Sequence, residues 1–391
     1  MAGVWVSILS ITISLAQPEL QLSPQEASFC ELAHRKENQE SLDTLVTHLF
    51  PRRGEIPVTC DQVYQNLKTR TGLVLVEPLE PDWPQLRNLN LIREFTHYAV
   101  LSIRGQALKN VEGLEKFSNL RTLSLENNQI QNWEALKSLT QLKELRLDGN
   151  PIASLDFLSE LQNLESLNLN DDGINSLAVI EKLPKLKNLN LRKNFIQDIS
   201  PLAKLKQLEN LSLDENQIED FCALTQIPVL KSFSISENKI RDLNCLSKMP
   251  ALTAVHLGSN QIEDLSALAL TPKLEQIVLR RNKVKDLAPL KAHPALDFID
   301  LDDNQIEDIG ILPTMPSLRS ITLSGNPLKA LEPLLEMRDL SELALSYPFV
   351  AQADLLKKMT WLNKLYFRQE ELRPEFEKIH SRLMNTKIQI F

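Results

Sequence analysis

The segment Leu186–Ile218 reads LKNLNLRKNFIQDISPLAKLKQLENLSLDENQI and contains the phrase L-x-x-L-x-L-x-x-N-x-I twice, 22 residues apart. Outward from this segment the same stride continues in both directions without an insertion. It is marked by nine asparagines and, at one register, by an aspartate: Asn128, Asn150, Asp172, Asn194, Asn216, Asn238, Asn260, Asn282, Asn304 and Asn326. A fixed period of this length indicates a solenoid, in which each repeat is one structural unit stacked on the next.

The residue types of the repeat follow from this geometry. The short L-x-L piece is predicted to be a strand, so its leucines face a shared core and the x residues face the other way. The asparagine follows the strand, where its amide offers both donors and an acceptor to backbone groups that the turn leaves unpaired. Asp172 keeps the acceptor but loses the donors, and we therefore expect its turn to be weaker or rearranged.

The pattern resembles the leucine-rich repeat family, in the 22-residue subclass of bacterial internalins and of a eukaryotic phosphatase-regulatory subunit. The segment Asn194–Leu202 matches the internalin-type phrase N-x-I-x-D-I-S-P-L. The resemblance covers residues 98–348 and implies an α/β fold, a curved horseshoe-shaped solenoid. In it a parallel β-sheet lines the concave face and short or 3₁₀ helices line the convex face. It also implies protein binding, although fold alone does not establish function.

The flanking segments predict caps on the repeats. Residues 17–97 are expected to form a helical N-terminal cap, with helices over residues 29–50 and 61–68 and with Asp61 as the N-cap of the second. Residues 349–391 are expected to hold a degenerate last repeat and a C-terminal cap. Such caps cover the leucine faces that the terminal repeats would expose.

Residues 1–16 are predicted to be a signal peptide. Val4–Ala16 is an apolar run of 13 residues, too short to span a bilayer, and Ser14-Leu15-Ala16 has small residues at the two positions that a signal peptidase recognises. No Lys or Arg precedes the run, so a mis-assigned start codon or a capping strand is the alternative. We expect an exported protein, periplasmic or secreted, with a cytoplasmic location as the alternative and without a transmembrane segment.

Composition argues against several classes of function. The net charge of −8 disfavours a nucleic-acid partner. Ten glycines in 391 residues include no G-x-x-x-x-G-K-[ST] phosphate loop. We expect no cofactor, no metal and a monomeric chain.

Four cysteines fall into two pairs, Cys30 with Cys60 and Cys222 with Cys245. The first pair precedes the repeats, and the second lies in adjacent repeats whose stacked turns should be about 5 Å apart, within the usual reach of a disulfide. Two disulfides suit an exported chain. The alternative is four buried thiols in a cytosolic protein, and a zinc site beside His34 and His48 is disfavoured because no C-x-x-C occurs.

The predicted concave face is mostly small and polar, with one region that differs. Exposed apolar and aromatic side chains beside arginine are typical of interface hot spots, although single exposed apolar residues are also common. We predict a partner-binding patch made of His256, Val278, Arg280, Phe298, Asp300 and Asp302.

One further column of residues and one possible catalytic triad are not expected to be functional sites. The aspartates four residues after the asparagine are expected to cap convex turns rather than bind Ca²⁺, which needs converging oxygens; they are Asp198, Asp220, Asp242, Asp264, Asp286 and Asp308. A triad of His256, Ser234 and Asp300 is disfavoured because Asp300 should lie two strands, roughly 10 Å, from His256. We therefore predict no catalytic residues.

Two hypotheses of function remain. The first is an exported bacterial recognition module that binds a protein on its concave face. The second is an intracellular regulatory scaffold that binds an enzyme such as a protein phosphatase. The signal peptide and the cysteines favour the first, and an enzyme is a distant third.

Overall fold

The computed structural model describes residues 23–49, 58–76, 85–346, 353–366 and 389–390. The predicted signal peptide, residues 1–16, lies outside them. The chain divides into two compact units, Met1–Gly173 and Ile174–Phe391, which are described separately below.

The first unit begins with a helical segment and continues into parallel strands. Its helices are α1 (Pro24–Ala33), η1 (Lys36–Asn38), α2 (Gln39–Leu49) and α3 (Cys60–Thr69). The strands are β1 (Gly72–Leu75), β2 (Val100–Ile103), β3 (Thr122–Ser124), β4 (Glu144–Arg146) and β5 (Ser166–Asn168). Between the later strands lie the 3₁₀ helices η2 (Leu114–Lys116), η3 (Glu134–Ser138) and η4 (Asp156–Glu160).

Two capping boxes set the starts of helices in this segment. The Ser23 hydroxyl accepts the backbone N–H of Glu26, whose carboxylate accepts the N–H of Ser23. Thr59 and Gln62 form the equivalent pair before α3, so the predicted N-cap at Asp61 was wrong by two residues. The helix expected over residues 29–50 is interrupted at residues 34–38, and α1 begins earlier, at Pro24.

An aromatic cluster packs these helices onto the first repeats. The ring centroids of Phe29 and Tyr64 are 5.5 Å apart, and those of Tyr64 and Phe95 are 5.4 Å apart. Tyr98 is fully buried, and its hydroxyl donates to the carbonyl of Leu67 at 2.8 Å. The aromatic rings thus supply apolar contact at the start of the solenoid, where leucine of a preceding repeat is missing.

The second unit is built from repeating strands. They are β6 (Asn188–Asn190), β7 (Asn210–Ser212), β8 (Ser232–Ser234), β9 (Ala254–His256), β10 (Gln276–Val278), β11 (Phe298–Asp300), β12 (Ser320–Thr322), β13 (Glu342–Ala344), β14 (Lys364–Tyr366) and β15 (Gln389–Ile390). Adjacent strands pair in parallel, and from β6 to β14 each residue lies beside the one 22 positions later, as in Val278 beside Asp300.

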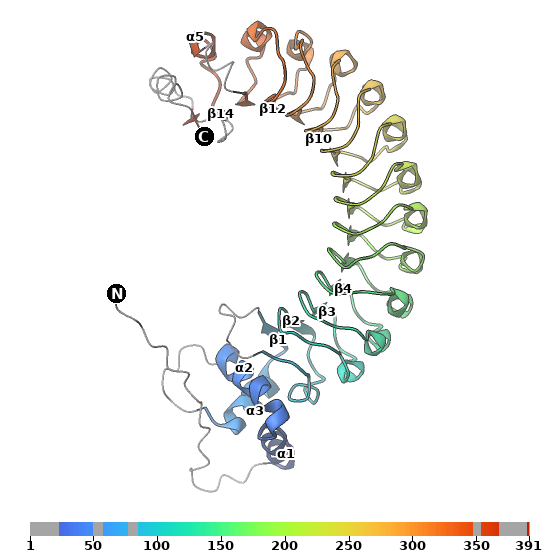
Figure 1. Ribbon diagram of the computed structural model, residues 1–391, viewed down its shortest axis with the longest axis vertical. Helices are drawn as coiled ribbons and strands as arrows, with labels where there is room; N and C mark the ends of the chain where they lie inside the picture. Colours follow the sequence, from blue (N-terminus) through green and yellow to red (C-terminus); the bar gives the residue numbers. More distant parts are fainter. Residues whose placement is uncertain (1–22, 50–57, 77–84, 347–352, 367–388, 391) are drawn as a thin grey trace, which may run out of the picture. The chain divides into compact units, whose positions relative to one another are not determined.

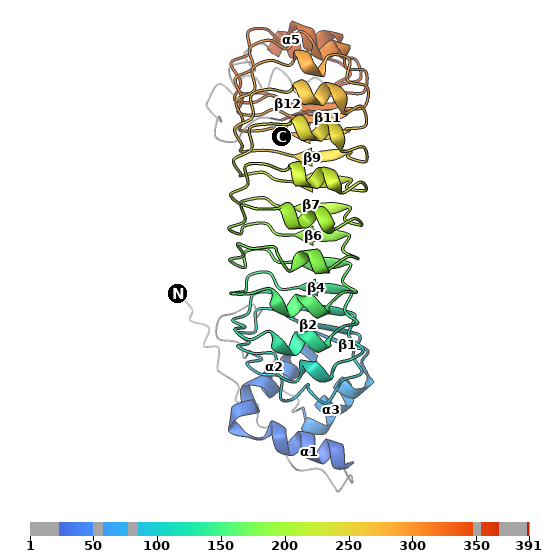
Figure 2. The same cartoon turned by 90° about the vertical axis from the view of Figure 1, so that its right-hand side faces the viewer.

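Short helices occupy the opposite side of the second unit. They are η5 (Ile180–Lys182), η6 (Ser200–Lys204), η7 (Cys222–Gln226), η8 (Asn244–Lys248), η9 (Ser266–Leu270), η10 (Ala288–Leu290), η11 (Leu312–Thr314), η12 (Glu332–Glu336) and α5 (Ala353–Leu356). Within this unit the strands lie on the inner side and the short helices on the outer side (Figure 1), and the helices stack in a row (Figure 2). The solenoid prediction, with a parallel sheet on one face and 3₁₀ helices on the other, is confirmed.

The asparagines form a buried ladder, as Asn216 illustrates. Its amide nitrogen donates to the carbonyls of Leu191 (2.9 Å) and Leu213 (3.0 Å), and its oxygen accepts the N–H of Ile196 at 3.0 Å. The same set of contacts recurs at Asn238, Asn260, Asn282 and Asn304. Each side chain therefore joins two repeats and satisfies backbone groups that water cannot reach. The predicted role of the asparagine is confirmed.

Candidate protein-binding face

The predicted patch consists of outward-facing residues of β9–β11 and of the turns that follow β10 and β11. His256 and Arg280 are exposed, whereas Val278 and Phe298 are half-buried. The strand register places Val278 beside both His256 and Asp300, and places Phe298 beside Gln276 and Ser320. Val278 and Phe298 thus lie on adjacent strands and on the same side of the sheet, with the imidazole of His256 one strand away.

Arg280 lies over Gly258 of the preceding repeat. A Cβ atom added at Gly258 would lie 3.1 Å from Cγ of Arg280, which is closer than ordinary van der Waals contact. Most other repeats of this unit carry a larger residue at the position of Gly258. The missing side chain leaves the arginine stem room to lie along the sheet.

Two carboxylates of the patch accept hydrogen bonds from other groups of the chain. Oδ1 of Asp300 accepts the N–H of Asp302 at 3.1 Å and the hydroxyl of Thr322 at 2.6 Å. Oδ1 of Asp302 accepts the N–H of Ser324 at 2.7 Å. Asp214 makes the same contact with the N–H of Ser236, also at 2.7 Å. Both patch aspartates therefore have a structural role that the sequence analysis did not anticipate.

Phe298 lines two hollows of the surface, which also share Ser320 and Glu342. One hollow of about 480 Å³ includes Gln276, Arg319 and Ser341. The other, of about 400 Å³, extends from Phe298 across β12 and β13 to Tyr366. Tyr366 was not among the predicted residues, although its place two positions after Lys364 on β14 puts it in the same outward column as Val278.

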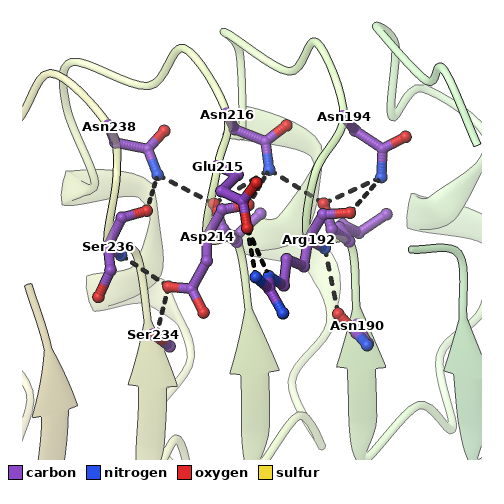
Figure 3. Close-up of polar contacts among 11 residues, drawn as sticks. Asn190, Arg192, Asn194, Asp214, Glu215, Asn216, Ser234, Ser236 and Asn238 are labelled. Atoms are coloured by element: carbon purple, nitrogen blue, oxygen red, sulfur yellow. Dashed lines mark hydrogen bonds and ion pairs between the residues drawn. The ribbon is translucent and has the colours of Figure 1, made fainter. Parts of the chain in front are cut away.

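The polar stretch on β6–β8 is internally paired, as Figure 3 shows. Nε of Arg192 donates to Glu215 at 2.8 Å, and the backbone N–H of Arg192 donates to Oδ1 of Asn190 at 3.1 Å. The Ser234 hydroxyl donates to Asp214. Because these groups already hydrogen-bond one another, a partner docking here would have to break such contacts or leave them in place.

Both predicted disulfides are present. Cys30 and Cys60 are bonded with their Cα atoms 5.5 Å apart, and Cys222 and Cys245 with theirs 5.3 Å apart. The first links α1 to α3, and the second links η7 to η8. Asp220 lies near the second pair, but sulfurs bonded to each other are not thiolate ligands for a metal.

The aspartate column caps the outer turns, as predicted. Oδ1 of Asp198 accepts the N–H of Ser200 at 2.8 Å, and this bond holds the pKa of the Asp198 carboxyl below its usual value. The other members make the same contact two residues on: Asp220, Asp242, Asp264, Asp286 and Asp308.

The disfavoured catalytic triad is not assembled. The hydroxyl of Ser234 donates to Asp214, and Asp300 accepts from Thr322. In the part of the chain that the structure describes, no hydrogen bond joins His256 to either residue.

Among the described residues, no helix is long and apolar enough to cross a membrane.

Comparison with solved structures supports the internalin-like type of repeat. An internalin of Listeria monocytogenes (inlF) is 25% identical, covers 83% of this chain and 94% of its own, and superposes with a TM-score of 0.71. A leucine-rich repeat protein of Leptospira interrogans shares the fold at 19% identity, over 84% of this chain and 97% of its own, with a TM-score of 0.63.

A receptor kinase ectodomain of Arabidopsis thaliana, GASSHO1/SCHENGEN3, solved in complex with CASPARIAN STRIP INTEGRITY FACTOR 2, also shares the fold. It is 17% identical over 85% of this chain and 48% of its own, with a TM-score of 0.59. A search of the curated proteins found no match. The family model for the leucine-rich repeat region matches residues 99–373, well over half of the 391-residue chain, and this protein therefore belongs to the leucine-rich repeat family.

Proposed function

We propose that this protein is an exported, non-enzymatic binding module that holds a protein partner on the strand face of its second unit. The observation that carries this proposal is the half-buried Phe298 on β11, which lines two hollows, with Val278 on the same face of the adjacent strand β10. Aromatic side chains next to well-formed hollows are where binding energy concentrates in protein interfaces.

The contrast with the rest of this face supports the location. On β6–β8 the outward side chains are asparagine and serine; Asn210 donates to Asn188, and Ser234 donates to Asp214. On β10 and β11 the outward residues include the apolar Val278 and Phe298, and the exposed Arg280 follows β10. An apolar centre with a polar rim is the usual anatomy of an interface.

Export is supported by two observations. Disulfides persist in oxidising compartments and are rare in the cytosol, and this chain carries two. The similarity to an internalin extends over 83% of the chain at 25% identity. Both weigh against the intracellular scaffold that the phosphatase-regulator resemblance allows.

A capture experiment with matched variants tests the binding proposal. Immobilised full-length protein is exposed to extracellular and surface proteins of its native environment, and captured proteins are identified by mass spectrometry. The affinity of the purified partner is then measured. Phe298→Ala with Arg280→Ala should weaken it at least about thirtyfold, since hot-spot truncations cost about 2 kcal/mol or more.

The control is the same pair of chemical changes elsewhere on the second unit. Phe195 is 59% exposed beside the asparagine ladder, and Arg241 is exposed and bonded to Gln261. Phe195→Ala with Arg241→Ala should leave the affinity unchanged. Equal affinity in both double variants would show that the strand-face patch is not the binding site.

A further inference from the structure

The hollow between Phe298 and Tyr366 has a distinctive composition. Its volume is about 400 Å³, enough for one large side chain. Aromatic rings stand at two of its edges, on β11 and β14, and the two intervening strands contribute the small outward residues Ser320, Thr322 and Ala344. The hollow exists because these small residues lie between two large ones.

The charged residues that line this hollow, among those the structure describes, are both acidic. They are Asp302 on the turn after β11 and Glu342 on β13. Asp302 accepts the N–H of Ser324, and Glu342 pairs with Lys364 at 2.7 Å. A carboxylate has two oxygens and about four acceptor sites, so Glu342 can accept a donor in addition to Lys364.

Carboxylates beside aromatic rings favour a cation. A guanidinium or ammonium group is attracted both by the carboxylates and by the negative face of an aromatic ring. An uncharged apolar side chain would fit the volume but would desolvate Asp302 and Glu342 without replacing their water contacts, which disfavours it.

We propose that this hollow receives a basic side chain, arginine or lysine, of the protein partner. The inference rests on the proposed function, because it names the chemistry that the partner presents beside Phe298. It predicts that the partner's contact segment carries a basic side chain at this point.

The test uses small probes of one side chain each, so that it does not depend on identifying the partner. N-acetyl-arginine methylamide is titrated into the full-length protein and followed by NMR of the ¹³C-labelled alanine methyl groups, including that of Ala344. N-acetyl-citrulline methylamide has nearly the same shape without the charge, and N-acetyl-leucine methylamide is an apolar probe. The arginine probe should bind at least about fivefold more tightly than either, and its binding should weaken with salt.

Matched variants locate the binding. Asp302→Asn with Glu342→Gln should weaken the arginine probe at least about fivefold. The control is Asp214→Asn with Glu209→Gln. Asp214 makes the same 2.7 Å backbone contact as Asp302, and Glu209 pairs with Lys231 as Glu342 pairs with Lys364. It should bind the arginine probe like the wild type, and thermal melts of both variants confirm that they are folded.

Three outcomes would overturn the inference: equal binding of the arginine and leucine probes, equal losses in the two double variants, or no binding of the arginine probe. The proposed function would survive each of them if Phe298→Ala with Arg280→Ala still abolished partner binding. Loss of that effect, with arginine binding intact, would instead remove the proposed function, and with it the assignment of the basic side chain to the partner, while the preference of the hollow for arginine would stand.

Discussion

Oδ1 of Asp172 accepts the backbone N–H of Asn150 at 2.7 Å, 22 residues earlier in the chain. The oxygens of the asparagine ladder in the second unit accept instead from the residue 20 positions earlier, as Asn216 does from Ile196. Asn128, in the same unit as Asp172, makes both contacts: its amide oxygen accepts the N–H of Gln106, 22 residues earlier, and that of Leu108, 20 residues earlier, each at 3.1 Å. The contact of Asp172 with Asn150 is therefore one that an amide can also make. Asp172 is only 2% exposed, and burial raises the pKa of its carboxyl to about 8.

This pKa predicts a stability that falls as pH rises. A raised carboxyl pKa means that the folded chain keeps a proton which the unfolded chain has lost, so the folded state is favoured most below the usual value of 3.8 and progressively less up to about pH 8. Asp172→Asn removes this penalty. We expect it to raise the free energy of unfolding by about 1–3 kcal/mol at pH 9 and to have much less effect at pH 4.

Urea denaturation at both pH values measures this difference. Burial also raises the pKa of Asp148, so part of the pH dependence should remain in the variant. A destabilising effect of Asp172→Asn at pH 9 would show that this turn requires the negative charge.

The ladder predicts that replacing a buried asparagine lowers the free energy of unfolding much more than replacing an exposed one. Asn260 is 8% exposed and bonds to backbone groups of two repeats, among them the carbonyl of Ile235 and the N–H of Ile240. Asn260→Ala should lower the free energy of unfolding by about 1–3 kcal/mol, because these buried groups lose their partner. Asn210→Ala is the control, since Asn210 is exposed on β7 and its side chain donates to the side chain of Asn188, which is also exposed. It should change stability by less than about 0.5 kcal/mol in the same denaturation experiment.

The two disulfides close loops of similar length, with sequence separations of 30 and 23. Replacing both cysteines of either pair with serine should therefore cost a similar amount, about 2–4 kcal/mol. Peptide mapping of the unreduced native protein should show both linked pairs, and thermal melts of the two double variants compare their contributions. Four free thiols in protein taken from its native compartment would contradict both the pairing and the proposal of export.

Most of the fold follows from side-chain types that repeat, whereas the site depends on residues that break the repeat. The leucine and asparagine positions determine which face is buried and where each turn lies, because every register applies the same constraint again. The hollow beside Phe298 has no such redundancy, since it depends on the sizes of Ser320, Thr322 and Ala344 on neighbouring strands and on Tyr366 beyond them. The N-cap at Thr59 in place of Asp61 shows the same limit, because several nearby polar residues can cap a helix and tertiary contacts choose among them.

Substitution of Gly258 should move the side chain of Arg280 without removing its charge, so it tests whether the position of the arginine matters for binding. In Gly258→Ala the new Cβ would lie 3.1 Å from Cγ of Arg280, so the flexible arginine stem has to shift by a few tenths of an ångström or more. The φ angle of Gly258 is not positive, so alanine fits the backbone conformation there without strain. We expect a change in unfolding free energy within about 0.5–1 kcal/mol.

Partner affinity should respond more strongly than stability. If Arg280 contributes to binding from its present position, Gly258→Ala should weaken the partner's affinity by roughly three- to tenfold, mainly through faster dissociation. Arg280→Ala in the Gly258→Ala background should then cost less than it does in the wild type, because the two changes act on the same contact. Surface plasmon resonance on the four proteins of this double-mutant cycle gives the coupling directly. Strict additivity of the two changes would mean that Gly258 does not position Arg280 for binding, and the arginine would then act through its charge alone.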